Sequence, residues 1–392
     1  MRDILDTITR WWEDGETFGL ATVVRTFRSA PRDPGAALAV AGSSVDPGAS
    51  GVPGASGGDV IGSVSGGCVE GAVYELAADV AQTGEPVLET YGVSDDDAFS
   101  IGLTCGGILD IFVEKVSQET FPELGDIADA VRRGEPVAVA TVISGPAGAL
   151  GARRVIWGDV TRPSTGSLGP GEMLDSHVDE DVRGMLEQGA TGTRTYSERG
   201  ERLGDELSVF VSSFAPAPRM YVFGAIDFAA AVARVGKFLG YHVTVCDARP
   251  VFATKSRFPD ADEVMVDWPH RFLAGAFEAD EIDARTVVAV LTHDPKFDVP
   301  VLEVALRTPA GYIGAMGSRR THADRLGRLR EAGLTEPELA RLRSPIGLDL
   351  GARTPEETAV SIAAELIQLR GGGSGRPLTD TAGRIHPEAA PV

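Results

Sequence analysis

Residues 220–247, MYVFGAIDFAAAVARVGKFLGYHVTVCD, decide the fold of the second half of the chain. The apolar run at the start predicts a short strand that ends at Gly224. A helical pattern follows over about 228–239, and a second apolar run leads to Asp247. Strand, glycine turn, helix and strand in this order are typical of the first unit of a doubly wound parallel sheet.

The alternation of strands and helices continues beyond this stretch. Further strands are predicted near 263–267, 286–291 and 311–315, and helices near 298–307 and 320–332. A capping box with proline at the first helical position, Thr354-Pro355-Glu356-Glu357, opens a helix that runs through Leu369. We therefore expect a Rossmann-like domain over 219–370, with a tail at 371–392.

The residues before this domain predict a different architecture. Two prolines favour an extended linker at 216–218, and we expect an α+β domain over 1–215. Its strands are predicted near 18–24, 36–40, 60–64, 87–91 and 108–114, and its helices near 3–13 and 68–82. Residues 41–59, rich in glycine, serine, proline and alanine, are interpreted as a surface insertion.

A weak internal repeat runs through the first domain. Three short strings have later echoes: Ala21–Val24 in Ala140–Ile143, Gly62–Gly66 in Gly166–Pro170, and Asp110–Val113 in Ser208–Val211. Such self-similarity indicates two repeat halves, 1–118 and 119–215. The second half has no cysteine where the first has Cys68 and Cys105, so a chemical role is expected in the first half only.

The composition excludes several classes of protein. The 392 residues carry a net charge of −21, which disfavours binding to nucleic acid or to an anionic membrane surface. Apolar residues make up 43%, enough for packed cores. The three cysteines are widely spaced, which fits a reducing compartment. With no apolar signal core near the start and no membrane-length apolar run, we expect a cytoplasmic protein.

One glycine-rich turn is the strongest local candidate for chemistry. Gly62–Glu70 reads GSVSGGCVE and leads into a predicted helix. Backbone N–H groups of Gly66 and Gly67 at a helix start bind anions, and thiols placed there often have pKa values of roughly 3.5–7.5. Two interpretations of Cys68 stay open: a reactive thiolate, or a buried and inert side chain.

A second loop of the same kind precedes the strand near 108–114. Cys105-Gly106-Gly107 again places a cysteine beside paired glycines, and the two loops predict a shared pocket. The spacing of 37 residues from Cys68 to Cys105 has no zinc-ribbon character, and the histidines do not cluster with the cysteines, so no structural zinc is expected.

Three arginines, Arg25, Arg28 and Arg32, lie close together in an otherwise acidic chain. Guanidinium groups bind phosphate through paired hydrogen bonds, so this loop is a candidate anion site. The alternative is a solvated loop held by salt bridges.

The second domain begins like a dinucleotide site, because Asp247 follows Gly224 by 23 residues, near the ~20 typical of a ribose-binding acid. The glycine fingerprint is broken, however, since Ile226 stands at the second glycine position and Asp227 adds a negative charge. A conventional NAD site is therefore not expected at this turn.

Two further loops follow strands of this domain, where doubly wound sheets bind ligands. One contains His293, which acts in a site or is a hydrogen-bonded structural residue. The other contains Gly317, Ser318 and Arg319 and suits an anionic group.

These motifs together resemble the XdhC/CoxI family of accessory proteins for molybdenum hydroxylases. The strings that carry the resemblance are Ser29-Ala30-Pro31-Arg32, Gly62–Glu70, Cys105-Gly106-Gly107, Asp247-Ala248-Arg249-Pro250, Thr292-His293-Asp294, Gly314–Arg320 and Ser344-Pro345-Ile346-Gly347-Leu348-Asp349. The family commonly has Gly-x-Gly-His at the Rossmann turn, where this chain has Gly224-Ala225-Ile226-Asp227.

The resemblance implies an accessory factor more than an enzyme. Such a protein binds the molybdenum cofactor, protects it while its sulfido ligand is installed, and inserts it into the large subunit of a xanthine dehydrogenase or carbon monoxide dehydrogenase. A cysteine desulfurase is a further implied partner. On this hypothesis Cys68 and Cys105 contact the molybdenum or its incoming sulfur, since soft thiolates suit them, while Arg32 and residues 318–320 hold anionic parts.

Two alternatives of other classes stay open beside this interpretation. An NAD(P)-dependent oxidoreductase would use the Rossmann-like domain around Gly224 and Asp247. A purely structural adaptor would bind no small molecule. A homodimer is compatible with each of the three.

Overall fold

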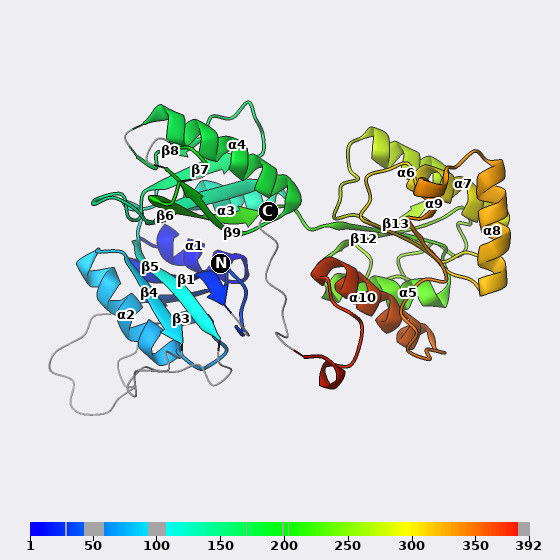
Figure 1. The fold of residues 1–392 in the computed structure, drawn as a ribbon, viewed down its shortest axis with the longest axis horizontal. Coiled ribbons are helices and arrows are strands. Elements are labelled where there is room, and N and C mark those ends of the chain that lie inside the picture. Colours follow the sequence, from blue (N-terminus) through cyan, green and yellow to red (C-terminus); the bar gives the residue numbers. More distant parts are fainter. Residues whose placement is uncertain are drawn as a thin grey trace. The chain divides into compact units, whose positions relative to one another are not determined.

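The computed structural model describes residues 1–27, 30–42, 59–92, 107–169, 171–197, 200–202 and 204–382. It divides into two compact units whose boundary lies between Pro216 and Ala217 (Figure 1). Cys105, Gly106, Arg28 and most of the predicted insertion at 41–59 lie outside the described residues.

The first half of the N-terminal unit contains one antiparallel sheet and two α-helices. In chain order its elements are η1 (Arg2–Ile4), α1 (Leu5–Glu13), β1 (Phe18–Phe27), β2 (Ala37–Ala41), β3 (Val60–Gly62), α2 (Glu70–Thr83), β4 (Val87–Gly92) and β5 (Ile108–Val116). The strand order is β3-β2-β1-β5-β4. The predicted strands and helices are all present, although α2 begins two residues later than expected.

The second half of this unit has the same sequence of elements. They are α3 (Leu124–Arg132), β6 (Val137–Ser144), β7 (Arg153–Trp157), β8 (Thr165–Gly166), α4 (Glu172–Gln188), β9 (Gly192–Tyr196) and β10 (Leu207–Phe214). The strand order β8-β7-β6-β10-β9 repeats that of the first sheet position by position.

The register of the two sheets aligns the repeated strings. Leu38 of β2 pairs with Gly62, and Arg154 of β7 pairs with Gly166. Both glycines have positive φ, +91° and +83°. A Cβ at Gly62 would lie 2.1 Å from the Ala37 carbonyl oxygen, and one at Gly166 would lie 2.2 Å from that of Arg153. Since neither position accepts a side chain, the two glycines have the same structural role in the two sheets.

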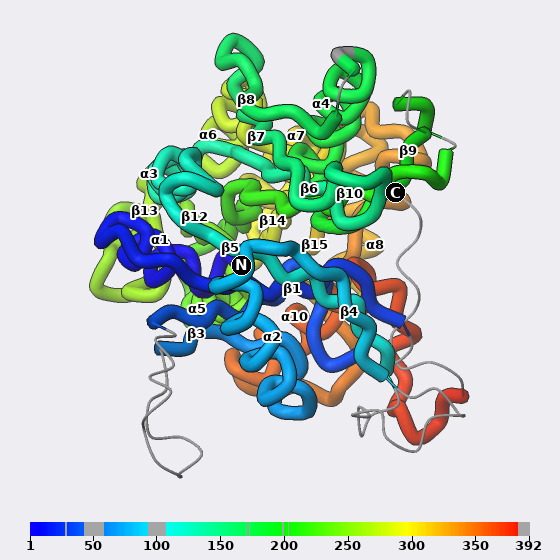
Figure 2. Tube along the Cα trace, turned by 90° about the vertical axis from the view of Figure 1, so that its left-hand side faces the viewer, coloured from blue at the N-terminus to red at the C-terminus, as the bar shows by residue number. Residues whose placement is uncertain are grey.

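The two sheets stack with helices on their outer faces. Figure 2 shows α2 and α4 at opposite ends of this stack, and Ala21 and Ala140 face them from β1 and β6. Between the sheets lies a core to which both halves contribute, with α1 and α3 packed into it. The interior between the two sheets is therefore the part of this unit that both halves build together.

The C-terminal unit contains six parallel strands and the helices that connect them. Its elements are β11 (Arg219–Phe223), α5 (Asp227–Phe238), β12 (His242–Asp247), β13 (Glu263–Val266), α6 (Pro269–Glu278), β14 (Val287–Val290), α7 (Pro295–Ala305), β15 (Tyr312–Ala315), α8 (Arg319–Glu331), α9 (Glu336–Leu339), β16 (Leu342–Arg343), α10 (Pro355–Gly371) and η2 (Leu378–Asp380). The strand order is β13-β12-β11-β14-β15-β16. This is the doubly wound order of a Rossmann fold, which confirms the predicted fold class.

Helices cover both faces of this sheet. One face packs against α5 and α10, and the other packs against α6, α7 and α8 (Figure 1). The capping box at Thr354 is confirmed: its hydroxyl accepts from the Glu357 amide at 3.2 Å. Helix α7 begins at Pro295 rather than near 298, because the Asp294 side chain caps it by accepting from the Lys296 amide.

No helix among the described residues is both long enough and apolar enough to cross a membrane.

Candidate functional site

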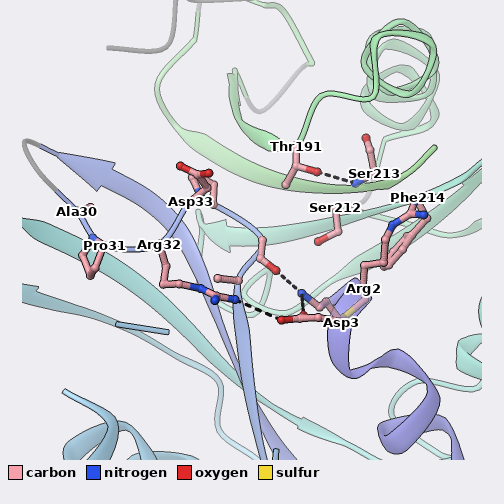
Figure 3. A pocket seen from close by; sticks show the side chains of 14 residues that line it. Arg2, Asp3, Ala30, Pro31, Arg32, Asp33, Thr191, Ser212, Ser213 and Phe214 are labelled. Carbon is pink, nitrogen blue, oxygen red and sulfur yellow. Dashed lines mark hydrogen bonds and ion pairs between the residues drawn. The ribbon is translucent and has the colours of Figure 1, made fainter. Parts of the chain in front are cut away.

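A pocket of about 620 Å³ lies in the N-terminal unit, at the junction of its two halves (Figure 3). The first half contributes residues 1–3 and the loop 30–36, and the second half contributes Thr191 and Ser212–Phe214 of β10. A volume of this size is within the range of small-molecule sites, roughly 300–1,000 Å³. The lining mixes guanidinium, carboxylate and hydroxyl groups and so suits a polar ligand.

Arg32, predicted as an anion-binding residue, lines this pocket. Its Nη2 donates a hydrogen bond to the Asp3 carboxylate at 3.2 Å, and the side chain is 39% exposed (Figure 3). This is a single contact rather than a paired one, so the guanidinium keeps donors for a ligand.

Arg2 adds a second positive group to the lining. Its Nη2 donates to the Ala215 carbonyl oxygen at 2.6 Å, and its guanidinium lies 5.8 Å from the centre of the Phe214 ring. The pocket therefore has a cationic side close to an aromatic ring.

Arg25 has a different role from Arg32. Its Nη2 donates to the Ser208 hydroxyl at 2.8 Å, and its Nη1 lies 4.0 Å from the Asp110 carboxylate. Ser208 belongs to β10 and Asp110 to β5, so Arg25 links the two halves. For this arginine the salt-bridged alternative therefore applies, whereas Arg28 lies outside the described residues.

The glycine-rich turn before α2 is closed by the chain's own carboxylate. Glu70 accepts hydrogen bonds from the Ser65 amide at 2.9 Å and the Gly67 amide at 2.8 Å, and also from the hydroxyls of Ser63 and Ser65. The Gly66 amide donates to the Ser63 hydroxyl at 3.0 Å. The structure thus corrects the prediction of an open anion site at Gly66 and Gly67, because these amides already have acceptors.

The same contacts determine the charge state of Glu70. Burial alone would raise its pKa, but hydrogen bonds from Ser65 and Ser63 outweigh burial and lower the pKa to about 2. The carboxylate is therefore ionised at neutral pH and holds the turn in this conformation.

Cys68 lies in this turn, two residues before α2, and its side chain is half-buried. It packs against the apolar cluster between the first sheet and α2, and it is not among the residues that line the pocket at Arg32. Gly107 is buried directly before β5, whereas Cys105 and Gly106 lie outside the described residues. A shared pocket of the two thiols therefore stays a prediction.

The Rossmann turn of the C-terminal unit is also closed by a carboxylate. Asp247 accepts from the Ala225 amide at 2.7 Å and from the Arg249 amide at 2.9 Å, and Arg249 Nη2 donates to it at 2.8 Å. Burial raises the pKa of Asp247, but these hydrogen bonds outweigh it and hold the pKa below the ordinary value. The amide after Gly224 is thus taken by a negative group where a pyrophosphate would need it.

A buried ion pair lies behind the loop that carries His293. Arg325 Nη2 donates to Asp298 at 2.8 Å and to the Met316 carbonyl oxygen at 2.8 Å, and the Thr292 hydroxyl donates to the same carboxyl group. Burial raises the pKa of Asp298. His293 itself is exposed and borders a cavity of only about 110 Å³ with these residues.

The loop before α8 holds the other predicted anion-binding residues. The Ser318 hydroxyl caps the helix by accepting from the Thr321 amide at 3.1 Å, after Gly317 with its positive φ. The Arg319 side chain is exposed. Its role in binding an anion stays a prediction.

Two family profiles match the chain over most of its length. The profile of the XdhC and CoxI family matches residues 11–92 and 130–197, and the profile of the XdhC Rossmann domain matches residues 220–366. The chain belongs to the XdhC/CoxI family. Both profiles follow the division into two units seen in the structure.

Individual proteins that are similar to this chain have names that agree with the family profiles. A Bacillus subtilis protein, named as a probable subunit of xanthine dehydrogenase, is 29% identical over 91% of this chain and 94% of its own length. The molybdenum cofactor insertion chaperone PaoD of Escherichia coli is 30% identical over 43% of this chain and 45% of its own length. A crystal structure described as a xanthine dehydrogenase from Bacillus halodurans matches with a TM-score of 0.65 and 25% identity, covering 97% of both chains.

Several residues of the candidate site were not predicted from the sequence. Asp3, Thr191 and Ser212 line the pocket with Arg32, although they are far apart in the chain. Only the stacking of the two sheets assembles them. Glu70 lies within a glycine-rich motif, but its closing of the turn follows from side-chain geometry that spacing does not show.

Proposed function

We propose that this protein binds the molybdenum cofactor and inserts it into a molybdenum hydroxylase of the xanthine dehydrogenase kind. The observation that carries the proposal is the open polar pocket at Arg32, in the unit that matches the XdhC and CoxI profile. The name of the relative PaoD, a cofactor insertion chaperone, supports the same role.

The chemistry of the pocket suits this cargo. The cofactor consists of a phosphate, a fused polar ring system and a molybdenum bound through two sulfur atoms. Guanidinium groups such as that of Arg32 pair with phosphate, and the hydroxyls of Thr191 and Ser212 suit a polar ring. Among the described residues no three His, Cys, Asp or Glu side chains converge to hold a metal, so the metal would be held through its organic ligand.

Several finer features belong to the same proposal. Sulfuration of the cofactor on this protein would involve Cys68 and Cys105, with a cysteine desulfurase as the sulfur source. A partner of the carbon monoxide dehydrogenase kind, a homodimer and a cytoplasmic location are further expectations. Retained pterin and activation of the partner enzyme, measured for Cys68→Ala and Cys105→Ala, test the thiol role. Wild-type pterin retention and wild-type activation of the partner enzyme in both variants would rule out a role of the thiols.

The NAD(P)-dependent oxidoreductase has no observation in its favour. The Asp247 carboxylate occupies the Ala225 amide at the Rossmann turn, and Asp227 pairs with Arg257 at 3.3 Å. At this turn the Ala225 amide and the Arg257 guanidinium are thus already bonded to carboxylates of the chain.

The proposal is tested by purifying the protein from a molybdenum-replete host and identifying released small molecules by mass. We expect a molybdopterin species at a substantial fraction of one per chain, together with activation of a cofactor-free xanthine dehydrogenase. Protein that carries no pterin and activates nothing, while folded, would refute it.

A further inference from the structure

The two halves of the N-terminal unit repeat the same fold, so the position of the pocket at Arg32 has an equivalent elsewhere in this unit. The strand registers identify the equivalent residues. In the first sheet Thr22 pairs with Ala37, and in the second sheet the equivalent Thr141 pairs with Arg153. In the same way Leu20 pairs with Glu114, whereas Val139 pairs with Ser212. Ala37 therefore corresponds to Arg153, and Ser212 corresponds to Glu114.

The counterpart position is filled by an ion pair. Arg153 Nη2 lies 2.5 Å from the Glu114 carboxylate, and Nη1 donates to the Thr120 carbonyl oxygen at 3.0 Å. The guanidinium stacks over the Phe121 ring, 3.7 Å from its centre. The two charged side chains are only 9% and 13% exposed. A planar cation and its carboxylate thus occupy this position.

The two halves pack against each other equally closely at the pocket and at the equivalent position that the ion pair occupies. A Cβ at Gly35 would lie 3.1 Å from the Thr191 side chain, and one at Gly151 would lie 3.3 Å from the Pro86 side chain. Gly35 and Gly151 are equivalent, since their amides donate to Val23 and Val142 respectively. The halves are therefore equally close at these two glycines, and the two positions differ in that Ser212 replaces Glu114 on the pocket side and the fully buried Ala37 replaces Arg153.

The groups at the open position include donors and acceptors of hydrogen bonds that face the pocket. Ser212 of β10 has the register position that Glu114 has in β5 and lines the pocket, and Arg32 lies on the facing loop (Figure 3). Arg32 makes only one hydrogen bond to the protein, to Asp3, among the described residues. A polar space of about 620 Å³ is therefore present where the other half carries an ion pair, and it is suited to a guest.

We infer that this pocket holds a planar, hydrogen-bonding ring in the place of the missing ion pair, with an anionic substituent directed to Arg32. A phosphorylated pterin has this chemistry. The inference rests on the proposed function and assigns its site: the ring lies at Ser212 and Thr191, and the phosphate pairs with the Arg32 guanidinium.

The test restores the counterpart's carboxylate in the pocket. Ser212→Glu, alone and together with Ala37→Arg, is purified from a molybdenum-replete host beside the wild-type protein. Pterin retained per chain is measured by fluorescence after oxidation. Thr165→Glu, which adds the same charge on the exposed strand β8 of the same unit, is the matched control. We expect at least a tenfold loss of pterin in the Ser212 variants and wild-type retention in the control.

A second variant distinguishes a loss of ligand binding from a folding defect. Arg32→Gln lies on a half-exposed loop and leaves the cores untouched. A pterin with a phosphate on its side chain, and the same pterin without it, are titrated by fluorescence quenching. We expect the wild-type protein to prefer the phosphorylated form about tenfold and Arg32→Gln to lose this preference with an unchanged melting temperature.

The outcomes separate the site from the function. Wild-type protein that retains pterin, with equal retention in a folded Ser212→Glu and no phosphate preference at Arg32, overturns the site and leaves the proposed function standing. Wild-type protein that retains no pterin overturns both.

Discussion

The Asp247 carboxylate lies 2.7 Å from the backbone nitrogen of Ala225 and accepts its hydrogen bond, while the Arg249 guanidinium donates to both oxygens of the same carboxylate. This contact closes the turn of the C-terminal unit that dinucleotide-binding proteins of this fold keep open. The fold of the unit and its ligand chemistry are therefore separate matters, and fold alone does not establish function.

The first prediction concerns nicotinamide nucleotides. Because the turn amide is taken by a negative group, we expect no saturable binding of NADH or NADPH up to about 1 mM, which corresponds to a binding free energy weaker than about −4 kcal/mol. Nucleotide fluorescence during titration measures this. A dissociation constant in the micromolar range would contradict our assignment of the turn as closed.

The second prediction concerns pH and Glu70. Its pKa is about 2 in the folded protein and near 4.5 in the unfolded chain. A lowered carboxyl pKa stabilises the fold above about pH 4.5, and this contribution is lost as the pH falls towards 2. We expect Glu70→Gln to lower the free energy of unfolding at pH 7 by about 1–2 kcal/mol, a value reduced for solvent screening.

Denaturant unfolding of both proteins at pH 7, 4 and 3 measures this difference. The gap between wild type and Glu70→Gln should shrink as the pH falls. A gap that is constant from pH 7 to 3 would show that the hydrogen bonds to the ionised carboxylate do not stabilise the turn.

The third prediction concerns the two equivalent glycines. Gly62→Ala and Gly166→Ala each place a Cβ about 2 Å from a carbonyl oxygen in a strand pairing. We expect each substitution to lower the free energy of unfolding by about 2–4 kcal/mol, because both strain and a steric clash result. Thermal unfolding reports the effect.

Gly66→Ala serves as the matched control, since Gly66 also has a positive φ but no atom within 4 Å of the added Cβ. It should cost only about 1 kcal/mol. Equal effects at the three positions would mean that the clash is relieved by small shifts and that the equivalence of the two sheets has no energetic consequence.

The fourth prediction concerns the ion pair between Asp298 and Arg325. Both side chains are at most 4% exposed, so removing one charge leaves the other buried without a partner. We expect Asp298→Ala to lower the free energy of unfolding by about 3–5 kcal/mol. The exposed pair of Arg330 and Glu336 is the comparison, and Glu336→Ala should change the free energy of unfolding far less, because water screens this pair. Similar losses at both pairs would contradict this account of burial.

Local patterns predicted the C-terminal fold well. The strand before Gly224, the helix after it and the strand ending at Asp247 all appear within about two residues of their expected bounds. Strand β16 was not predicted, because its two residues, Leu342 and Arg343, are too few to show an apolar pattern.

The candidate site depended on contacts that no local pattern shows. Arg32 was identified from its charge, but Ser212 and Thr191 reach the pocket only because two sheets stack. An alignment of the two repeats would have contained the signal, since it pairs Ala37 with Arg153 and Ser212 with Glu114. The open anion site predicted at Gly66 and Gly67 was wrong because the Ser63 hydroxyl accepts from the Gly66 amide and the Glu70 carboxylate accepts from the Gly67 amide.

The position of molybdenum in the cofactor-loaded protein tests the central claim most directly. Anomalous diffraction at the molybdenum edge, from crystals of protein purified with its cargo, locates the metal without a model of the ligand. We predict one peak beside the pocket lined by Arg32 and Ser212 in the N-terminal unit. A peak at the carboxyl ends of the parallel strands of the C-terminal unit would contradict it.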